Sequence, residues 1–320
     1  MAQSSLPYPK RASNEVSRRT VPLMGTFVTI EVVGPAAHLP QAHPSEINNA
    51  IERAFDWFYR VEECCTRFEP RSEVMQLTSR PEVAVPASAI LFEAVQFALA
   101  VAGETRGAFD PTIGHAMETR GFNREYRTGQ TVRTGLTEGA VSYRDVRLNP
   151  VQQTITLLRP LILDLGAVAK GLAIDLAARE LQPFENFAID AGGDLYLAGC
   201  NAKGELWSVG ISHPRRSGEL LDTVTVSNRA VCTSGDYERS VGGGSDGNHI
   251  LDPRSGHSAK SAISATVLAP TAMMGDAIST AAFVLGPSEG IHLFERMGVE
   301  GFIVTPSFER FATKGFPSAV

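Results

Sequence analysis

The segment from Asp276 to Thr280 has side chains that could hold a metal ion. Asp276 and Thr280 are four residues apart, so on a helix the carboxylate and the hydroxyl lie on one face, close enough to share one cation. No Cys or His accompanies them at ligand spacing, and hard oxygen donors of this kind suit Mg²⁺. An alternative stays open, in which Asp276 is a first-turn helix charge and Thr280 bonds back to the helix backbone.

A second segment, residues 161–171, combines an apolar run with a carboxylate, small residues and a lysine. The run Leu161–Leu163 predicts a buried strand, and a carboxylate at Asp164 needs a partner there because an ionised group held away from water is costly. The small side chains of the following turn let a ligand approach the start of a helix predicted from Ala167 to about Leu181, whose free N–H groups favour phosphate. Lys170 adds a cation near the same point.

His249 follows a glycine-rich loop, residues 242–248, that could move over a substrate. A histidine in that position could act as a base near neutral pH. The alternative, a purely structural histidine, is also compatible with the sequence.

Three further turns carry polar side chains next to predicted strands: residues 107–112, 191–194 and 233–236. Residues 191–194 and 233–236 are each compatible either with ordinary hairpin chemistry or with a backbone nest for an anion. In the turn at 107–112, the Phe109 ring could stack on a flat ring or fill the core. The chain has neither GxGxxG after a strand nor GxxxxGK[ST], so the two commonest nucleotide fingerprints are absent.

Strands and helices alternate irregularly along the chain, which favours an α+β fold with two interlocked lobes, mixed, mainly antiparallel sheets and packed helices. Four closely spaced strands in the middle of the chain predict an antiparallel meander. Residues 1–20 are predicted to be disordered, and residues 21–320 to form one domain. The predicted strands are 25–33, 161–163, 187–190, 195–197, 207–211, 223–226, 262–268 and 302–304, and the predicted helices begin at Pro44, Ser88, Ala167, Met273 and Glu289.

Composition excludes several classes of partner. The 320 residues carry a net charge of −6, which argues against binding to nucleic acid or an anionic membrane. The four cysteines show no CxxC spacing, so a thiolate metal site is not expected. No apolar run approaches the roughly eighteen residues of a membrane span. Arg18-Arg19 precedes a strand-like segment rather than an export signal, so we expect a cytoplasmic protein.

Taken together and in order, these segments resemble the ApbE family of FAD:protein FMN transferases. The resemblance runs from Met24-Gly25-Thr26 to about Gly286. The matching pieces are Arg67-Phe68 with Ser72-Glu73, Gly107 to Asp110, Asp164 to Gly171, Gly192-Gly193-Asp194, Thr233 to Tyr237, His249 to Pro253 and Asp276 to Ala281. Gly275 and Asp190-Ala191 depart from the family pattern, where Ala and Asn are common, but neither departure removes a proposed ligand.

The resemblance implies a Mg²⁺-dependent transferase that cleaves the pyrophosphate of FAD. The enzyme would join FMN by a phosphoester to a threonine of an acceptor protein and release AMP. An FAD pyrophosphatase that gives FMN and AMP, and a non-catalytic FAD-binding protein, are the alternatives.

The resemblance also implies roles for individual residues. Asp276, Thr280 and the Ala167 carbonyl would hold Mg²⁺, and His249 would be the catalytic base. Contacts to FAD are implied for Met24, Phe68, Ala108, Phe109, Asp110, Asp164, Lys170 and Ile250.

Overall fold

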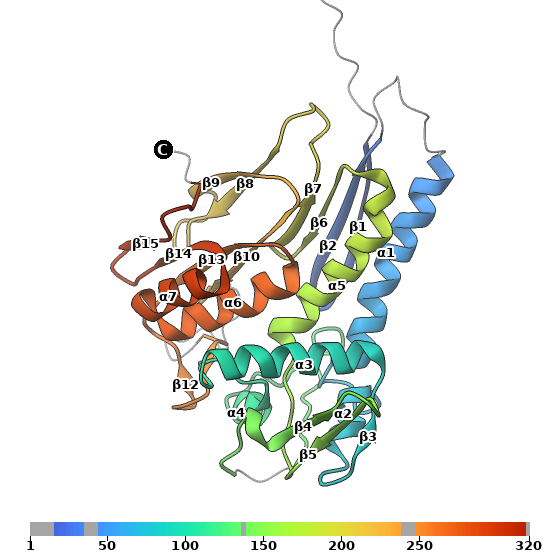
Figure 1. The fold of residues 1–320 in the computed structure, drawn as a ribbon, viewed down its shortest axis with the longest axis vertical. Coiled ribbons are helices and arrows are strands. Elements are labelled where there is room, and N and C mark those ends of the chain that lie inside the picture. Colours follow the sequence, from blue (N-terminus) through green and yellow to red (C-terminus); the bar gives the residue numbers. More distant parts are fainter. Residues whose placement is uncertain (1–15, 35–43, 136–138, 238–247, 318–320) are drawn as a thin grey trace, which may run out of the picture.

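The computed structural model describes residues 16–34, 44–135, 139–237 and 248–317. Its centre is an eight-stranded sheet in which every pair of neighbours is antiparallel (Figure 1). In spatial order the strands are β1 (Val16–Leu23), β2 (Thr26–Val33), β6 (Phe187–Ala191), β7 (Asp194–Ala198), β10 (Arg229–Gly235), β13 (Ser264–Ala269), β14 (Glu300–Val304) and β15 (Arg310–Ala312).

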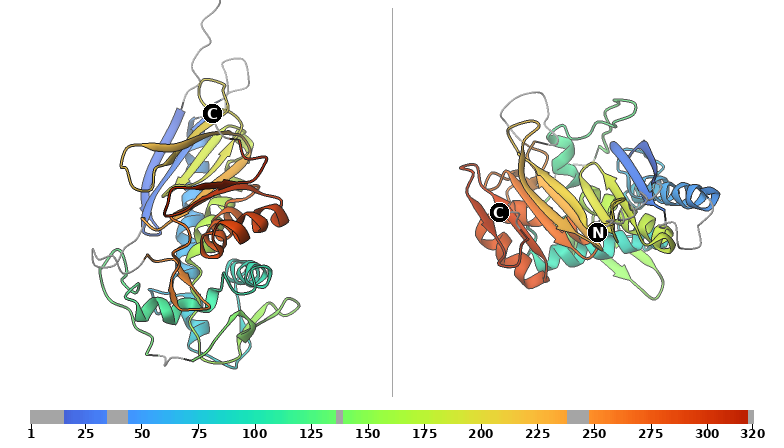
Figure 2. Two further views of the ribbon diagram at one scale, coloured as in Figure 1. Left: turned by 90° about the vertical axis from the view of Figure 1, so that its left-hand side faces the viewer. Right: turned by 90° about the horizontal axis from the view of Figure 1, so that it is seen from above.

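Helices cover one face of this sheet, as the view from above shows (Figure 2). Alternate strand residues such as Ile30, Cys232 and Val267 point towards them and join the main core. The four helices are α1 (Pro44–Cys65), α5 (Gly166–Leu181), α6 (Ala272–Leu285) and α7 (Pro287–Met297).

The opposite face of the sheet is covered in part by a hairpin, β8 (Trp207–Ser212) with β9 (Leu220–Val226). Strand residues of the alternate set, including Val231 and Leu268, pack with Val224 into a second, smaller core. The sheet is therefore covered on both faces along β7 and β10.

A second group of elements lies below the sheet in Figure 1 and confirms the α+β fold with helices and mainly antiparallel strands. The small sheet β3-β5-β4 packs there with helix α2. The elements are α2 (Glu73–Thr78), β3 (Val85–Pro86), α3 (Ala89–Glu104), η1 (Pro111–Ile113), α4 (Gly114–Thr119), η2 (Tyr143–Asp145), β4 (Val146–Asn149) and β5 (Thr154–Leu157). Two short strands, β11 (Leu251–Asp252) and β12 (His257–Ser258), pair beyond β10, and a further short helix, η3 (Gln182–Phe184), follows α5.

Three predictions about local structure are wrong. Residues 16–20, predicted to be disordered, form the first part of β1, where Thr20 bonds across to Thr29; residues 1–15 lie outside the described part. The middle strands do not form one meander, because β8 and β9 leave the main sheet and β7 pairs with β10 instead.

The apolar run at 161–163 is buried but is not a strand. Ile162 and Asp164 bond instead to the backbone of Gly114 and Pro111, so a loop beside η1 and α4 satisfies this segment. A continuous apolar run signals burial, and periodicity alone does not distinguish a buried strand from another buried segment.

Helices α5 and α6 touch through their backbones. A Cβ atom on Gly171 would lie 2.4 Å from the Cα of Met273, so only glycine permits this approach. Asp175 of α5 accepts hydrogen bonds from the first N–H groups of α6, those of Ala272 (2.7 Å) and Met273 (2.9 Å). This contact fixes the two helices that carry the three predicted metal ligands and Lys170.

Within the described ranges, none of the helices is both long and apolar enough to cross a membrane. The cytoplasmic location stays a prediction.

Candidate active site

Asp164 has a protein partner that the sequence did not identify. The Nε atom of Arg67 lies 2.6 Å from a carboxylate oxygen of Asp164, and Arg67 is 5% exposed. The other carboxylate oxygen accepts the backbone N–H of Gly166 at 2.9 Å. Asp164 therefore joins a buried guanidinium to the start of α5, which offsets the cost of placing a carboxylate in this segment.

The first turn of α5 is less open to an anion than we expected. Gly166 donates to Asp164, and the N–H groups of Val168 and Ala169 both bond to the Leu165 carbonyl. Ala167, however, has non-helical dihedral angles, φ −92° and ψ 16°. That ψ departs from the helical value near −42°, so the Ala167 carbonyl is turned away from the regular helix direction.

Lys170 lies between two nearly buried carboxylates. Its Nζ atom contacts Asp194 on β7 and lies 3.7 Å from a carboxylate oxygen of Asp276 on α6. Asp194 also accepts the backbone N–H of Thr233, which ties the cluster to β10. In this group of three side chains two carboxylates share one amine.

Thr280 lies one turn beyond Asp276 on α6, as the four-residue spacing predicted. Its Oγ1 lies 3.0 Å from the Ser234 hydroxyl, which also contacts Ser279 at 2.9 Å. Residues 233–235, predicted to be part of a turn, belong to β10, and this strand brings Ser234 to the helix that carries Asp276 and Thr280.

Buried Cys232, also on β10, has its pKa raised, first by burial and then by the nearby Asp276 carboxylate. Burial and a neighbouring negative charge both disfavour the thiolate. We therefore expect Cys232 to be an uncharged core residue rather than a nucleophile or a metal ligand.

His249 comes near the Arg67 and Asp164 pair through Phe122. The rings of His249 and Phe122 meet edge to face with centroids 6.5 Å apart, and the Phe122 carbonyl accepts a hydrogen bond from Nη2 of Arg67. The Nδ1 atom of His249 is shielded from solvent. The loop at 242–248 that precedes the histidine lies, except for Asn248, outside the described residues.

Met24 belongs to the same neighbourhood. It occupies the tight turn between β1 and β2 with φ 52°, and the Tyr126 hydroxyl of the loop after Phe122 interacts with the backbone of the adjoining Gly25. On its other side this turn meets the glycine turn before Asp194: a Cβ on Gly192 would lie 2.2 Å from Oγ1 of Thr26.

The remaining residues predicted to contact FAD differ in how deeply they are buried. Phe68 is half-buried against the Arg67 guanidinium, whereas Ala108, Phe109 and Ile250 are buried in the main core. Asp110 accepts backbone N–H groups from Thr112 and Tyr143, and its burial raises the pKa of this carboxyl. Their contacts with FAD stay predictions.

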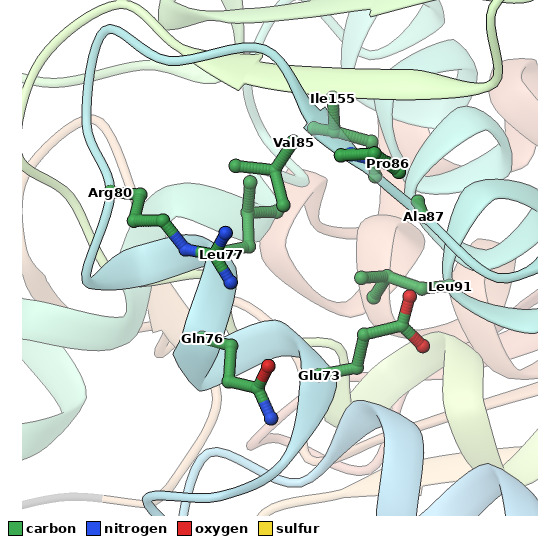
Figure 3. A pocket seen from close by; sticks show the side chains of 9 residues that line it. All are labelled: Glu73, Gln76, Leu77, Arg80, Val85, Pro86, Ala87, Leu91 and Ile155. Atoms are coloured by element: carbon green, nitrogen blue, oxygen red, sulfur yellow. The ribbon is translucent and has the colours of Figure 1, made fainter.

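Two hollows in the described surface lie outside this cluster. The first, between α2, β3 and α3, has a volume of about 50 Å³, well below the 300–1,000 Å³ of typical ligand pockets (Figure 3). The second, about 510 Å³, is lined by His213, Arg215, Arg216, Leu220, Leu221 and Phe308. Neither contains a predicted site residue, so the candidate active site is defined by its side-chain contacts.

Comparison with known proteins gives the family. The model of the ApbE family matches residues 24–303, and the chain belongs to this family. A Haemophilus influenzae protein named FAD:protein FMN transferase is 28% identical over 268 residues, 80% of this chain and 75% of the relative. The protein of that name from Escherichia coli K12 is 26% identical over 320 residues, 95% and 88% of the two chains.

Solved structures agree on the fold. The ApbE protein of Thermotoga maritima superimposes with a TM-score of 0.79 at 27% identity and covers 94% of this chain and 97% of that one. The family, the α+β fold and the expectation of an enzyme are thereby confirmed.

Sequence reasoning missed Arg67 and Asp194 as functional neighbours. Both stand in segments that match the family, but their contacts join Arg67 to Asp164 and Asp194 to Lys170 across long stretches of chain. The available signal was the need of a buried carboxylate for a cation, which does not say which cation.

Proposed function

We propose that residues 21–320 form one flavin transferase domain that moves FMN from FAD to a threonine hydroxyl of an acceptor protein, releases AMP and uses Mg²⁺. The names of the curated relatives support the substrate and the type of transfer. The observation that carries the proposal is the meeting of Lys170 and Asp276, 3.7 Å apart, where α5 and α6 touch. A pyrophosphate needs a cation and oxygen ligands for a metal at one place, and this contact supplies both.

The proposed metal ligands are the Asp276 carboxylate, the Thr280 hydroxyl and the Ala167 carbonyl. All three are oxygen donors, which is the donor type that Mg²⁺ prefers. The described residues contain no cluster of three or more His, Cys, Asp and Glu side chains suited to a metal, and a site with one carboxylate would complete its shell with water and substrate phosphate. The turned carbonyl of Ala167 and the excess of carboxylate over amine around Lys170 both fit a bound cation.

When bound, Mg²⁺ would offset negative charge on the pyrophosphate oxygens. Lys170 binds the same pyrophosphate from α5 and is held in place by Asp194. The positive end of the α5 dipole adds to this charge. Charge stabilisation and alignment are the main demands of phosphoryl-type transfer, so these residues supply most of what the reaction needs.

His249 takes the proton from the acceptor hydroxyl as its oxygen attacks the phosphorus of the FMN half. A new oxygen–phosphorus bond forms, the phosphorus–oxygen bond to the AMP half breaks, and AMP leaves with the electron pair. The position of His249 beside Phe122, whose carbonyl binds Arg67, supports this role because it links the histidine to the Asp164 side of the site.

Asp164 contacts FAD at the start of α5. Around it, the flavin or adenosine groups are bound by six residues from four segments of the chain. These residues are Met24, Phe68, Ala108, Phe109, Asp110 and Ile250.

His249→Gly tests the transfer step. The variant is incubated with FAD, Mg²⁺ and an acceptor, and FAD, FMN, AMP and flavinylated acceptor are separated and measured. We expect loss of acceptor labelling with a smaller effect on hydrolysis by water. His257→Gly is the matched control, because His257 is exposed on β12.

Equal losses of transfer and hydrolysis in His249→Gly would contradict a histidine dedicated to the acceptor. FMN and AMP without labelled acceptor in the unmodified protein would indicate a pyrophosphatase. Saturable FAD binding without turnover at any Mg²⁺ concentration would indicate an FAD-binding protein.

A further inference from the structure

We propose that Arg67 binds the flavin ring of FAD directly, through Nη1 of its guanidinium, which donates to a carbonyl oxygen of the isoalloxazine. This inference rests on the proposed function and adds to it a residue that recognises the flavin half of the substrate.

Two of the three nitrogens of the Arg67 guanidinium have protein acceptors. Nε donates to Asp164 at 2.6 Å, and Nη2 donates to the Phe122 carbonyl. Nη1 is buried and has no hydrogen-bond partner among the described residues. Each Nη carries two N–H donors, and a buried donor without an acceptor costs about 1–3 kcal/mol, more for a charged group.

The burial of Arg67 makes this unsatisfied donor informative. With 5% of its surface exposed, the residue cannot turn Nη1 into bulk water without breaking its bonds to Asp164 and Phe122. A ligand that brings an acceptor would remove the penalty. The acceptor we infer is therefore part of the substrate.

The surroundings of Arg67 favour a flat, neutral acceptor over a phosphate. Its Cζ atom lies 4.3 Å from the centroid of the Phe68 ring, and the Phe122 ring lies beside His249. The positive charge is already balanced by Asp164. A carbonyl on an aromatic ring suits this environment, whereas Lys170 and the start of α5 remain for the pyrophosphate.

A flavin would approach Nη1 of Arg67 from the side of Phe68 and Asp164. Phe68 is half-buried and covers one face of the guanidinium, and Asp164 keeps 18% of its side chain exposed. A flavin that enters on this side reaches Nη1 and lies against Phe68, one of the residues proposed to bind it.

Two further buried polar atoms also lack a hydrogen-bond partner in the described part of the chain. They are Nδ1 of His115 and Oε1 of Glu118, both on α4. This helix begins with the hydrogen bond from Gly114 to Ile162, two residues before Asp164, and leads into Phe122. The unsatisfied groups therefore lie on a helix that is hydrogen-bonded to the segment leading into Asp164.

The test compares Arg67→Lys with Arg71→Lys. Lysine keeps the charge but removes Nη1, and Arg71 is a matched control because its side chain is 90% exposed in the same loop. FAD binding is measured by titration calorimetry. ADP-ribose, which keeps the adenosine and pyrophosphate but lacks the flavin, is measured by competition. We expect Arg67→Lys to weaken FAD binding about tenfold to a hundredfold, as loss of a charged hydrogen bond does, and to leave ADP-ribose binding unchanged.

Unchanged FAD binding in Arg67→Lys would overturn the proposal. Equal weakening of FAD and ADP-ribose would also overturn it, because Arg67 would then support the site as a whole. Failure of the proposed function is distinguishable: FAD would bind in an Arg67-dependent way without being transferred to any acceptor.

Discussion

Replacement of Asp175 by asparagine should remove a pH dependence of stability that arises where α5 meets α6. Asp175 accepts the N–H groups of Ala272 and Met273, and burial raises the pKa of its carboxyl from the ordinary 3.8 to about 6. The helix that it caps carries Asp276 and Thr280. The state of this one carboxyl therefore affects the frame of the proposed metal site.

The sign of the effect follows from proton linkage. The folded protein holds this proton more tightly than the unfolded chain, so the stabilisation from Asp175 is complete below pH 3.8 and is lost as the pH rises through about 6. For these two pKa values, the contribution of Asp175 to the free energy of unfolding falls by roughly 1.4 kcal/mol between about pH 5 and about pH 8. Asparagine does not titrate, so the variant lacks this fall.

Asparagine has a cost of its own. Its Oδ1 can accept one of the two N–H groups, and the other loses its acceptor, which costs about 1–3 kcal/mol. This cost is nearly independent of pH. The free energy of unfolding of the variant should therefore rise relative to that of the unmodified protein by roughly 1.4 kcal/mol from about pH 5 to about pH 8.

Urea unfolding of both proteins at the two pH values measures this difference, and groups that titrate equally in both cancel. Glu63→Gln is the control, because Glu63 is an exposed carboxylate on α1. A difference between Asp175→Asn and the unmodified protein that does not change with pH would refute the reasoning.

Two glycines of the site helices give further predictions. Gly171→Ala places a Cβ 2.4 Å from the Cα of Met273, so we expect a loss of about 1–3 kcal/mol or more in urea unfolding, since backbone cannot give way easily. Gly103→Ala adds a Cβ that meets no atom within 4 Å apart from its own helix backbone and chain neighbours, so it should be neutral or slightly stabilising. An equal loss of stability there would contradict the packing explanation for Gly171. In Gly275→Ala, the added Cβ would lie 2.7 Å from the Cys232 sulfur, so this variant should have a lower Tm. Adding Cys232→Ala should restore part of the lost Tm. If it restores none, the strain lies elsewhere.

The sequence predicted the parts of the site that depend on local spacing. Asp276 and Thr280 do lie one turn apart on a helix, and α5 does begin two residues after Asp164, at Gly166. These features depend on helical periodicity and small-residue turns, which a single sequence records.

The contacts that complete the cluster could not be predicted in this way. Arg67 meets Asp164, and Lys170 meets Asp194, only because the sheet and helices bring distant segments together. The apolar run at 161–163 predicts a strand because burial and strand structure give the same pattern. The strand at residues 16–20 was missed because its burial is slight: most of its side chains are exposed, so hydrophobic alternation is weak there.

The most direct test of the central claim is the intact mass of a threonine-containing acceptor domain after incubation with this protein, FAD and Mg²⁺, with AMP measured in the same tube. We expect a gain of one FMN with matching AMP. We also expect loss of both in Asp276→Ala, with the fold intact, and retention of both in Asp56→Ala, where the exposed carboxylate lies on α1. FMN and AMP without a gain in acceptor mass, or unchanged labelling by Asp276→Ala in excess Mg²⁺, would contradict the central claim.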